Sequence, residues 1–296
     1  TGLRPNEGED RYLTGLKHNG GAGRAWSTFL DINHVSDVDY FRDLGNLTLD
    51  DNSLSHLQRR ASAGYKTSNW NYSVAAQDYQ AITQGLDDQY SVMPQVSADG
   101  YYRLSHSLVI DLKNRYSVFN HDDNRFVTGS RSSIDYGISW DKRWSWGYFK
   151  PQVRARHLRY SLNADQQSTL LDSKPSVSVP VYSIDTGIFL ERNVSWLNNY
   201  KQYFEPRLFY VRADYKDQST LPDFDTREFT PSYDLLFREN RFNGGDRISD
   251  ENRLTLAFTS LYIDQKTGQE RFRARIAQSI YYDDRRVTLS ADPDMT

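Results

Sequence analysis

The segment SIDYGISW, residues 133–140, shows the pattern on which the fold depends. Ile134, Tyr136, Ile138 and Trp140 alternate with serine, aspartate and glycine. A repeat of two places successive side chains on opposite faces of the backbone, as in a β-strand. The segment therefore predicts a strand with one apolar face and one polar face.

The same alternation recurs along the whole chain, whereas helical periodicity is nearly absent. In RFRARIAQSI, residues 271–280, three arginines share one face, where they need water or acidic partners. Most predicted strands have about 9–14 residues, which exceeds the ordinary five or six and is enough to cross a bilayer. The predicted strands are 10–18, 24–34, 57–67, 69–82, 88–98, 101–119, 128–141, 147–161, 180–192, 199–214, 251–263, 270–283 and 286–291.

The segment YYRLSHSLVIDL, residues 101–112, opens one of these predicted strands. Its alternation predicts one continuous strand over 101–119, preceded by a two-residue Asp-Gly hairpin turn at 99–100. On such a strand His106 lies on the face opposite to Ser105 and Ser107. This geometry argues against a hydrolase site formed by these three neighbours, since a base must reach its nucleophile.

Short and long connections alternate, and the longest span 35–56, 162–179 and 215–250. In an antiparallel meander the short turns then lie at one end, as in outer-membrane barrels with short periplasmic turns and long outer loops. All six tryptophans lie within or near the short turns, which predicts an aromatic belt at a membrane–water interface. These are Trp26, Trp70, Trp140, Trp144, Trp146 and Trp196.

The composition excludes several classes of protein. The chain of 296 residues is 38% hydrophobic and 14% aromatic, with a net charge of −3 and no cysteine. The aromatic content argues against disorder, and the charge gives no indication of nucleic-acid binding. Without cysteine there is no disulfide framework or thiolate metal site, and no apolar run is long enough for a transmembrane helix.

Several longer motifs resemble the LptD family of lipopolysaccharide-assembly outer-membrane proteins, in the order of that family. The most specific is YFEPRLFYVRADYKDQSTLPDFDT at 203–226. The others are LFRENRFNGGDRISDENRLTLAFTS at 236–260, SIDTGIFLER at 183–192, NHVSDVDYFRDLG at 33–45 and GQERFRARIAQSIYYDDRRVTL at 268–289. This resemblance covers nearly the whole chain.

The resemblance implies an antiparallel transmembrane barrel of about 26 strands, of which residues 1–296 supply about 12–13. It implies a plug lipoprotein, LptE, and lipopolysaccharide as partners, with a lateral opening to outer-membrane lipid. It also implies a jelly-roll domain that receives the glycolipid from a periplasmic bridge. We expect this chain to lack that domain, the family's cysteines and the terminal barrel strands.

Polar positions of the predicted strands are the candidates for contact with the plug or the glycolipid, because guanidinium groups suit phosphate. They are Arg103, Asp111, Asp185, Glu191, Glu205, Arg207, Arg271, Arg273 and Arg275. A solvated wall with cross-strand ion pairs is the alternative reading of these charges.

The segment 215–250 is too long for a passive connection, so we expect an extracellular loop folded over or into the barrel. An exposed outer loop is the alternative. Its predicted anchors are Phe224, Phe237, Phe242, Gly244, Gly245, Asp246 and Arg247.

No catalytic, metal or cofactor site is predicted. The six histidines show no metal-binding spacing, and HDDN at 121–124 lacks the spacing of a calcium loop. The rival functions are an outer-membrane porin or nutrient channel, and an outer-membrane lipid-modifying enzyme. A soluble β-rich binding protein is a more distant possibility.

Overall fold

The computed structural model describes residues 11–38, 40, 56–82, 89–163, 172–194 and 199–289. Nearly all regular structure in these residues is β-strand, joined by one short 3-10 helix, η3 (Tyr233–Phe237). The prediction of an all-β fold built from long antiparallel strands is confirmed. Among the described residues, no helix is both long and apolar enough to cross a membrane.

Fourteen strands form one sheet in which neighbours in sequence are mostly neighbours in space. Its order is β1-β2-β3-β4-β5-β6-β7-β9-β10-β12-β15-β16, with β8 on β9 and β11 on β12, and β1 and β16 end the order. The bounds are β1 Leu13–Gly20, β2 Trp26–Val35, β3 His56–Lys66, β4 Trp70–Ala81, β5 Ser91–Arg103, β6 Leu108–Asn120, β7 Gly129–Trp140, β8 Lys142–Trp144, β9 Gly147–Leu162, β10 Ser176–Ile188, β11 Leu190–Asn193, β12 Tyr200–Ala213, β15 Glu251–Asp264 and β16 Glu270–Tyr281.

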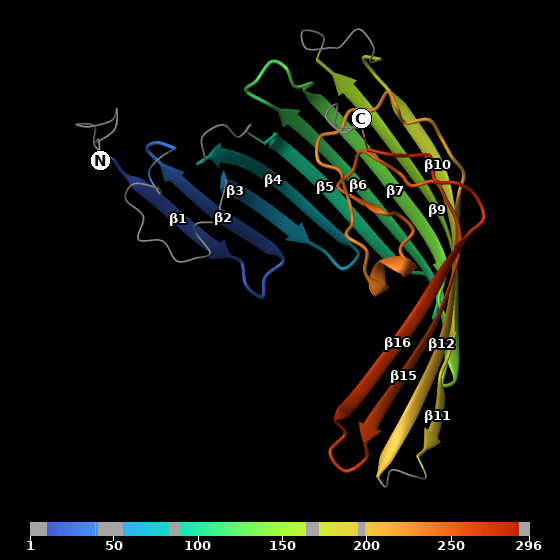
Figure 1. Cartoon of the computed structure of the whole chain (residues 1–296). Coiled ribbons are helices and arrows are strands. Elements are labelled where there is room, and N and C mark those ends of the chain that lie inside the picture. The colour runs from blue at the N-terminus through green and yellow to red at the C-terminus, as the bar shows by residue number, and fades with distance from the viewer. Residues whose placement is uncertain are drawn as a thin grey trace, which may run out of the picture. The chain divides into compact units, whose positions relative to one another are not determined.

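The chain divides into two compact units. The first contains residues 1–98, 115–132 and 160–173, and the second contains 99–114, 133–159 and 174–296. In the first unit β1 to β4 run side by side as antiparallel neighbours (Figure 1), with Leu16 opposite Ile32 and Tyr65 opposite Tyr72.

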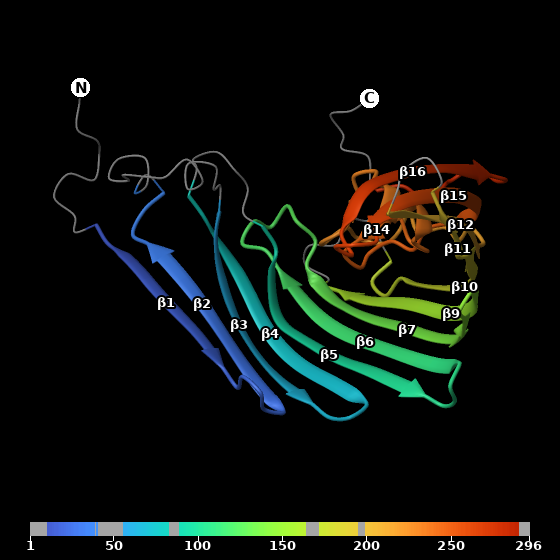
Figure 2. The same cartoon turned by 90° about the horizontal axis from the view of Figure 1, so that it is seen from below.

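In the second unit β9, β10, β12, β15 and β16 follow one another as antiparallel neighbours (Figure 2). The register is continuous across them, because Gly187 lies opposite both Tyr148 and Arg207, and Arg207 lies opposite Ala257. Alternate residues of these strands therefore share one face of the sheet.

One face of the second unit exposes large apolar side chains. Ile276 is 69% exposed, and it lies opposite Phe258, which is 46% exposed. The same strands place Arg275 opposite Thr259, and Thr259 opposite Glu205, on the other face. The alternation in the sequence therefore separates an apolar face from a charged face, as expected for a sheet that meets lipid on one side.

Two predictions of local structure are wrong. Residues 99–100 lie inside β5, and the turn to β6 is at 104–107, where the Ser105 hydroxyl accepts hydrogen bonds from the Ser107 and Leu108 amides. Residue types go on alternating through these four turn positions, so alternation alone does not reveal the turn. The predicted strand at 286–291 is also incorrect, since 284–289 have no strand pairing and 290–291 lie outside the described residues.

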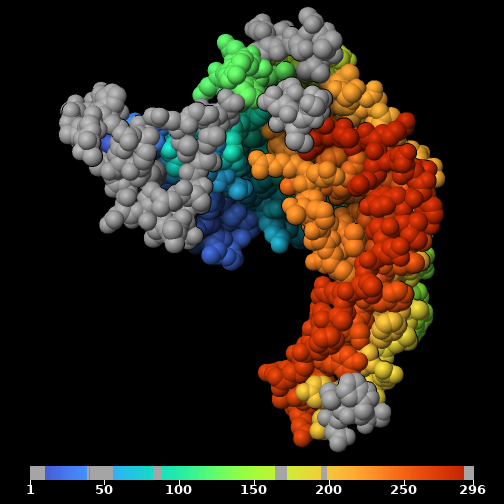
Figure 3. All heavy atoms as spheres, in the orientation of Figure 1, coloured from blue at the N-terminus to red at the C-terminus, as the bar shows by residue number. Residues whose placement is uncertain are grey.

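Between β12 and β15, residues 214–250 form a folded loop with two short paired strands, β13 (Arg227–Glu228) and β14 (Phe242–Asn243), and η3. In Figure 3 the orange atoms of this loop lie directly against the red atoms of the strands that follow it. We call residues 214–250 the cap. The segment 284–289, after β16, is bound to it.

Candidate functional site

The charged face of the second unit carries a cluster of ions beneath the cap, with a buried arginine among half-buried partners. Arg154 of β9 is 8% exposed and donates two hydrogen bonds to Asp111, at 2.7 and 3.0 Å. It donates a third to Asp135, at 2.6 Å. Gly137 makes room for this contact, because a Cβ atom there would lie 2.7 Å from Asp111 and 2.8 Å from Arg154. We call Asp111, Asp135, Arg154, Arg156 and Glu239 the ion cluster.

The cap supplies one member of this cluster. Glu239 accepts hydrogen bonds from Arg156 at 2.9 Å and from the Ser183 hydroxyl at 2.7 Å, and it lies 3.3 Å from Arg154. These partners come from β9 and β10. A side chain of the cap therefore completes the charge network of the sheet, and three carboxylates share two guanidinium groups.

A second contact joins the cap to β12. Arg207 donates two hydrogen bonds to Asp185, at 2.9 and 2.6 Å, and Tyr148 donates another to the same carboxylate at 2.9 Å. The guanidinium carbon of Arg207 lies 3.7 Å from the centre of the Phe237 ring. This geometry combines a bidentate ion pair with a cation–π contact.

The carbonyl groups of η3 are held by β15. Arg253, which is 5% exposed, donates to the carbonyl oxygens of Leu236 and Arg238 at 2.6 and 2.7 Å. The Thr255 hydroxyl donates to the same Leu236 oxygen at 3.0 Å. The cap thus contacts β9, β10, β12 and β15 through separate side chains.

The cap also has a core of its own. Asp246, which is fully buried, accepts hydrogen bonds from the Phe224 and Asp225 amides and from the Thr226 hydroxyl. Phe224 and Phe242 are 7% and 4% exposed. Gly244 has a φ of 73°, and a Cβ atom there would lie 2.2 Å from the Asp225 carbonyl oxygen, so this turn requires glycine.

The remaining predicted anchors join this core. The Gly245 amide donates to Asp225 at 3.0 Å. The Arg247 guanidinium, 3% exposed, donates to the carbonyl oxygens of Pro222 and Leu221 at 2.8 and 3.2 Å. All seven predicted anchors of the loop therefore lie within one folded segment.

A titratable group at the edge of this core gives the cap a pH dependence. Burial raises the pKa of Asp223, and the nearby Asp246 carboxylate raises it further. The folded cap then holds the Asp223 proton more tightly than the unfolded chain does, so stability falls as pH rises above the unfolded value of about 3.9. We expect Asp223→Asn to slow amide exchange in residues 214–250 at pH 7, and to have no such effect below pH 3. Faster exchange at pH 7 would contradict this reading.

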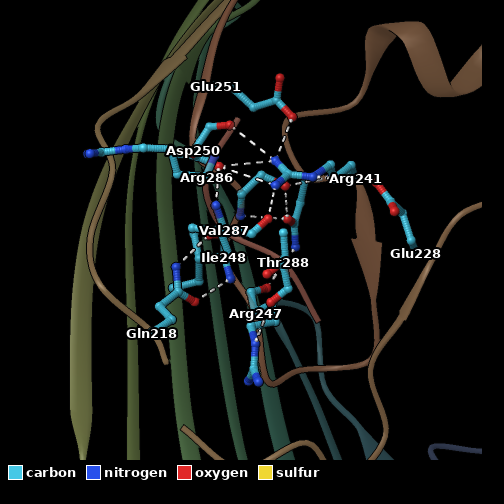
Figure 4. Close-up of polar contacts among 12 residues, drawn as sticks. Gln218, Glu228, Arg241, Arg247, Ile248, Asp250, Glu251, Arg286, Val287 and Thr288 are labelled. Atoms are coloured by element: carbon cyan, nitrogen blue, oxygen red, sulfur yellow. Dashed lines mark hydrogen bonds and ion pairs between the residues drawn. The ribbon is translucent and has the colours of Figure 1, made fainter. Parts of the chain in front are cut away.

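The segment after β16 is clamped to the cap (Figure 4). Asp250 accepts hydrogen bonds from the amides of Arg286 and Val287, at 2.6 and 3.2 Å. Arg241 contacts Asp250 at 3.2 Å and donates to the Val287 carbonyl oxygen, and Arg247 donates to Thr288. Val287 is 4% exposed. We call these contacts the clamp.

Four of the predicted polar residues come together in a pocket of about 360 Å³ on the charged face. Glu205, Arg207, Arg273 and Arg275 line it, below Tyr233 of η3. Arg275 lies 5.2 Å from the Tyr233 ring. With three guanidinium groups and two carboxylates, those of Glu205 and Asp234, this pocket offers charge-assisted hydrogen bonds to anionic or sugar-like groups.

Of the other predicted polar residues, Asp111 belongs to the ion cluster and Asp185 binds Arg207, whereas Arg103, Glu191 and Arg271 lie outside both sites. Arg103 donates to the Tyr101 hydroxyl, and Glu191 pairs with Lys201 at 3.1 Å. Arg271 lies beside a register shift at Tyr262/Ile263 and contacts Asp264 at 3.5 Å. This irregularity separates Arg271 from Arg273 and Arg275, which the sequence places on one continuous face.

Five of the predicted belt tryptophans lie at or beside short turns between strands. Trp26 and Trp70 begin β2 and β4 in the first unit. In the second unit Trp140 ends β7, and the rings of Trp144 and Trp146 stack 5.1 Å apart. Trp196 lies outside the described residues.

Sequence reasoning missed several residues of the site. Arg154 and Arg156 stand two apart in VRARH (153–157), which is a signal for two cations on one face, but nothing local indicates their partners. Glu239 and Asp250 lie in irregular segments where no periodicity applies. Within the described ranges no group of three or more histidines and carboxylates is arranged to bind a metal ion.

The sheet therefore has an apolar, exposed face and a charged face that is partly covered by a segment of the same chain. This combination is typical of the wall of a large antiparallel β-barrel. Comparison with known proteins specifies the family. The model of the family described as "LptD: LPS transport system D" matches residues 9–296, and the chain belongs to this family. The resemblance seen in the sequence motifs is confirmed.

Curated relatives agree with this assignment. The chain is 35% identical over 305 residues to the "LPS-assembly protein LptD" of Saccharophagus degradans, with 97% of this chain and 35% of the relative covered. The protein of the same name from Hahella chejuensis is 35% identical, with 97% and 37% covered, and that from Alcanivorax borkumensis is 36% identical, with 96% and 38% covered. The chain thus spans about a third of the length of these relatives.

Proposed function

We propose that this chain is part of an outer-membrane barrel that assembles lipopolysaccharide into the outer leaflet. The observation that carries this proposal is the division of one sheet into an apolar exposed face and a charged face. The names of the relatives, LPS-assembly proteins, supply the substrate. On this proposal the chain helps to move a glycolipid along the charged face and through the barrel wall. It makes and breaks no covalent bond.

On this proposal the apolar face meets lipid, and the charged face lines the lumen. The pocket around Arg207, Arg273 and Arg275 receives the phosphate or sugar groups of the glycolipid, or polar groups of the plug lipoprotein LptE. The cap narrows the lumen from the side of the long loops. A narrowed lumen is favourable for a plugged translocon, whereas a diffusion porin requires an open channel.

Photocrosslinking tests the proposed lumen directly. A photoreactive amino acid at Arg273, on the charged face, is expected to crosslink to lipopolysaccharide or a lipoprotein in cells. The same group at the neighbouring Ala274 faces the other way and is expected to reach only membrane lipid. Equal products at the two positions would overturn the assignment of faces. A clear difference without glycolipid or lipoprotein at 273 would favour a porin.

Two substitutions at neighbouring residues of β16 test, independently of crosslinking, which face of the sheet meets the membrane. Ile276→Arg places a charge on the apolar face and is expected to cost about 2–4 kcal/mol near the bilayer midplane. Arg275→Ile, on the charged face, is expected to leave the folding and membrane insertion of the barrel largely intact. The measurement is the fraction of heat-modifiable, folded protein in outer membranes. Equal losses in the two variants would contradict the proposal.

A further inference from the structure

A second pocket, of about 350 Å³, lies away from the charged face, where β11 pairs with β12. Leu190, Arg192, Gln202 and Phe204 line it together with Glu191. Leu190 lies opposite Phe204, and Arg192 lies opposite Gln202, so these four side chains share one face of the sheet. This is the apolar face, because Phe204 stacks on Phe258 with their ring centres 5.9 Å apart.

The polar end of this pocket is fixed by hydrogen bonds. Gln202 accepts a hydrogen bond from Arg192 Nε at 2.7 Å and donates one to the Ser260 hydroxyl at 2.8 Å. The bond to Gln202 uses only Nε of the guanidinium group, which leaves both Nη atoms to donate to another acceptor. Within the described part of the chain, no carboxylate forms an ion pair with Arg192.

The apolar end of the pocket continues toward the middle of the strands. Leu190 is 50% exposed and Phe204 is 38% exposed. Arg192 and Gln202 lie nearer the connection between β11 and β12, which is one of the short connections of the sheet. Along this face the order is therefore a cation with an amide, followed by aliphatic and aromatic surface.

We infer that this pocket binds one anionic glycerophospholipid from the leaflet that meets the short turns. The phosphate accepts hydrogen bonds from the Nη atoms of Arg192, and one acyl chain lies along Leu190 and Phe204. An arginine that faces hydrocarbon is unfavourable, but the cost falls close to zero at the level of the head groups. A bound phosphate explains both the cation on an apolar face and the pocket beside it.

This inference goes beyond glycolipid transport and rests only on the proposed membrane side of the sheet. Native mass spectrometry of the full-length protein, purified from outer membranes and titrated with phosphatidylglycerol, tests it. We expect one retained lipid in the native protein. Arg192→Gln is expected to weaken its retention at least fivefold, and Leu190→Trp, which fills the apolar end, is expected to weaken it as well.

The matched control is Arg143→Gln. Arg143 also lies near a short turn, but it is paired with Asp141 at 3.0 Å and does not line this pocket. Its substitution is expected to leave retention unchanged. Equal losses in the Arg143 and Arg192 variants would mean non-specific annular lipid and would overturn the inference. So would full retention in Arg192→Gln, or displacement of the lipid by inorganic phosphate alone. Crosslinking at 273 and 274 detects failure of the membrane assignment separately.

Discussion

Replacing Arg154 with methionine is expected to destabilise the protein by about 2–3 kcal/mol, because it removes the shared partner of three half-buried carboxylates. Asp111 and Asp135 both bind this guanidinium, and Glu239 lies 3.3 Å from it. Without Arg154, Asp135 and Glu239 share Arg156, and Asp111 loses its ion pair. The measurement is the free energy of unfolding in urea, followed by the loss of heat-modifiable mobility.

The control for this variant is an ion pair in water. Arg212 pairs with Asp214 at 3.0 Å, with 51% and 65% of the two side chains exposed. Arg212→Met is therefore expected to leave the free energy of unfolding nearly unchanged. Adding Asp111→Asn to Arg154→Met removes one unpaired charge and is expected to restore part of the loss. If Arg154→Met behaved like the exposed control, the ion cluster would not stabilise the fold.

Replacing Asp250 with alanine is expected to release the segment after β16 from the cap. The substitution removes the acceptor for the Arg286 and Val287 amides and one partner of Arg241. Two backbone N–H groups that lose their acceptor cost about 3 kcal/mol together, which corresponds to roughly 100-fold faster amide exchange. Hydrogen exchange at residues 284–289 measures this effect.

Two further variants distinguish a specific loss of the clamp from a general loosening of residues 214–250. Asp250→Asn keeps one acceptor oxygen and is expected to give an intermediate rate. Asp217→Ala removes an exposed carboxylate that accepts only from nearby groups such as the Ser219 amide, so exchange at 284–289 should remain as in the native protein. Unchanged exchange in Asp250→Ala would show that the clamp does not hold this segment.

The strands were predictable because alternation is a local signal. Ile276 and Arg275 lie on opposite faces as their positions in RFRARIAQSI indicate, and the register carries the same division to Phe258 and Glu205. The signal is weakest where the backbone departs from a regular ladder. At the turn 104–107 and at the irregularity near Arg271, the alternation of residue types stays intact while the structure changes.

The site was predictable only in part, because its partners are distant in sequence. Asp185 and Arg207 were both candidates, but that they bind each other depends on the register between β10 and β12. Glu239 reaches Arg156 across 83 positions. The loop motif carried the resemblance to a family, yet no local pattern places a glutamate of that loop between two arginines of a strand.

The cap has a mechanical consequence for the sheet beneath it. Backbone hydrogen bonds join only adjacent strands, so a sheet bends easily about an axis parallel to its strands. Glu239 binds side chains of β9 and β10, Phe237 rests on Arg207 of β12, and Arg253 of β15 holds the carbonyl groups of η3. One segment therefore braces four successive strands transversely, and the curvature of this part of the wall cannot change without breaking those ties. The stiffness of the sheet across β9, β10, β12 and β15 therefore depends on the contacts made by the cap.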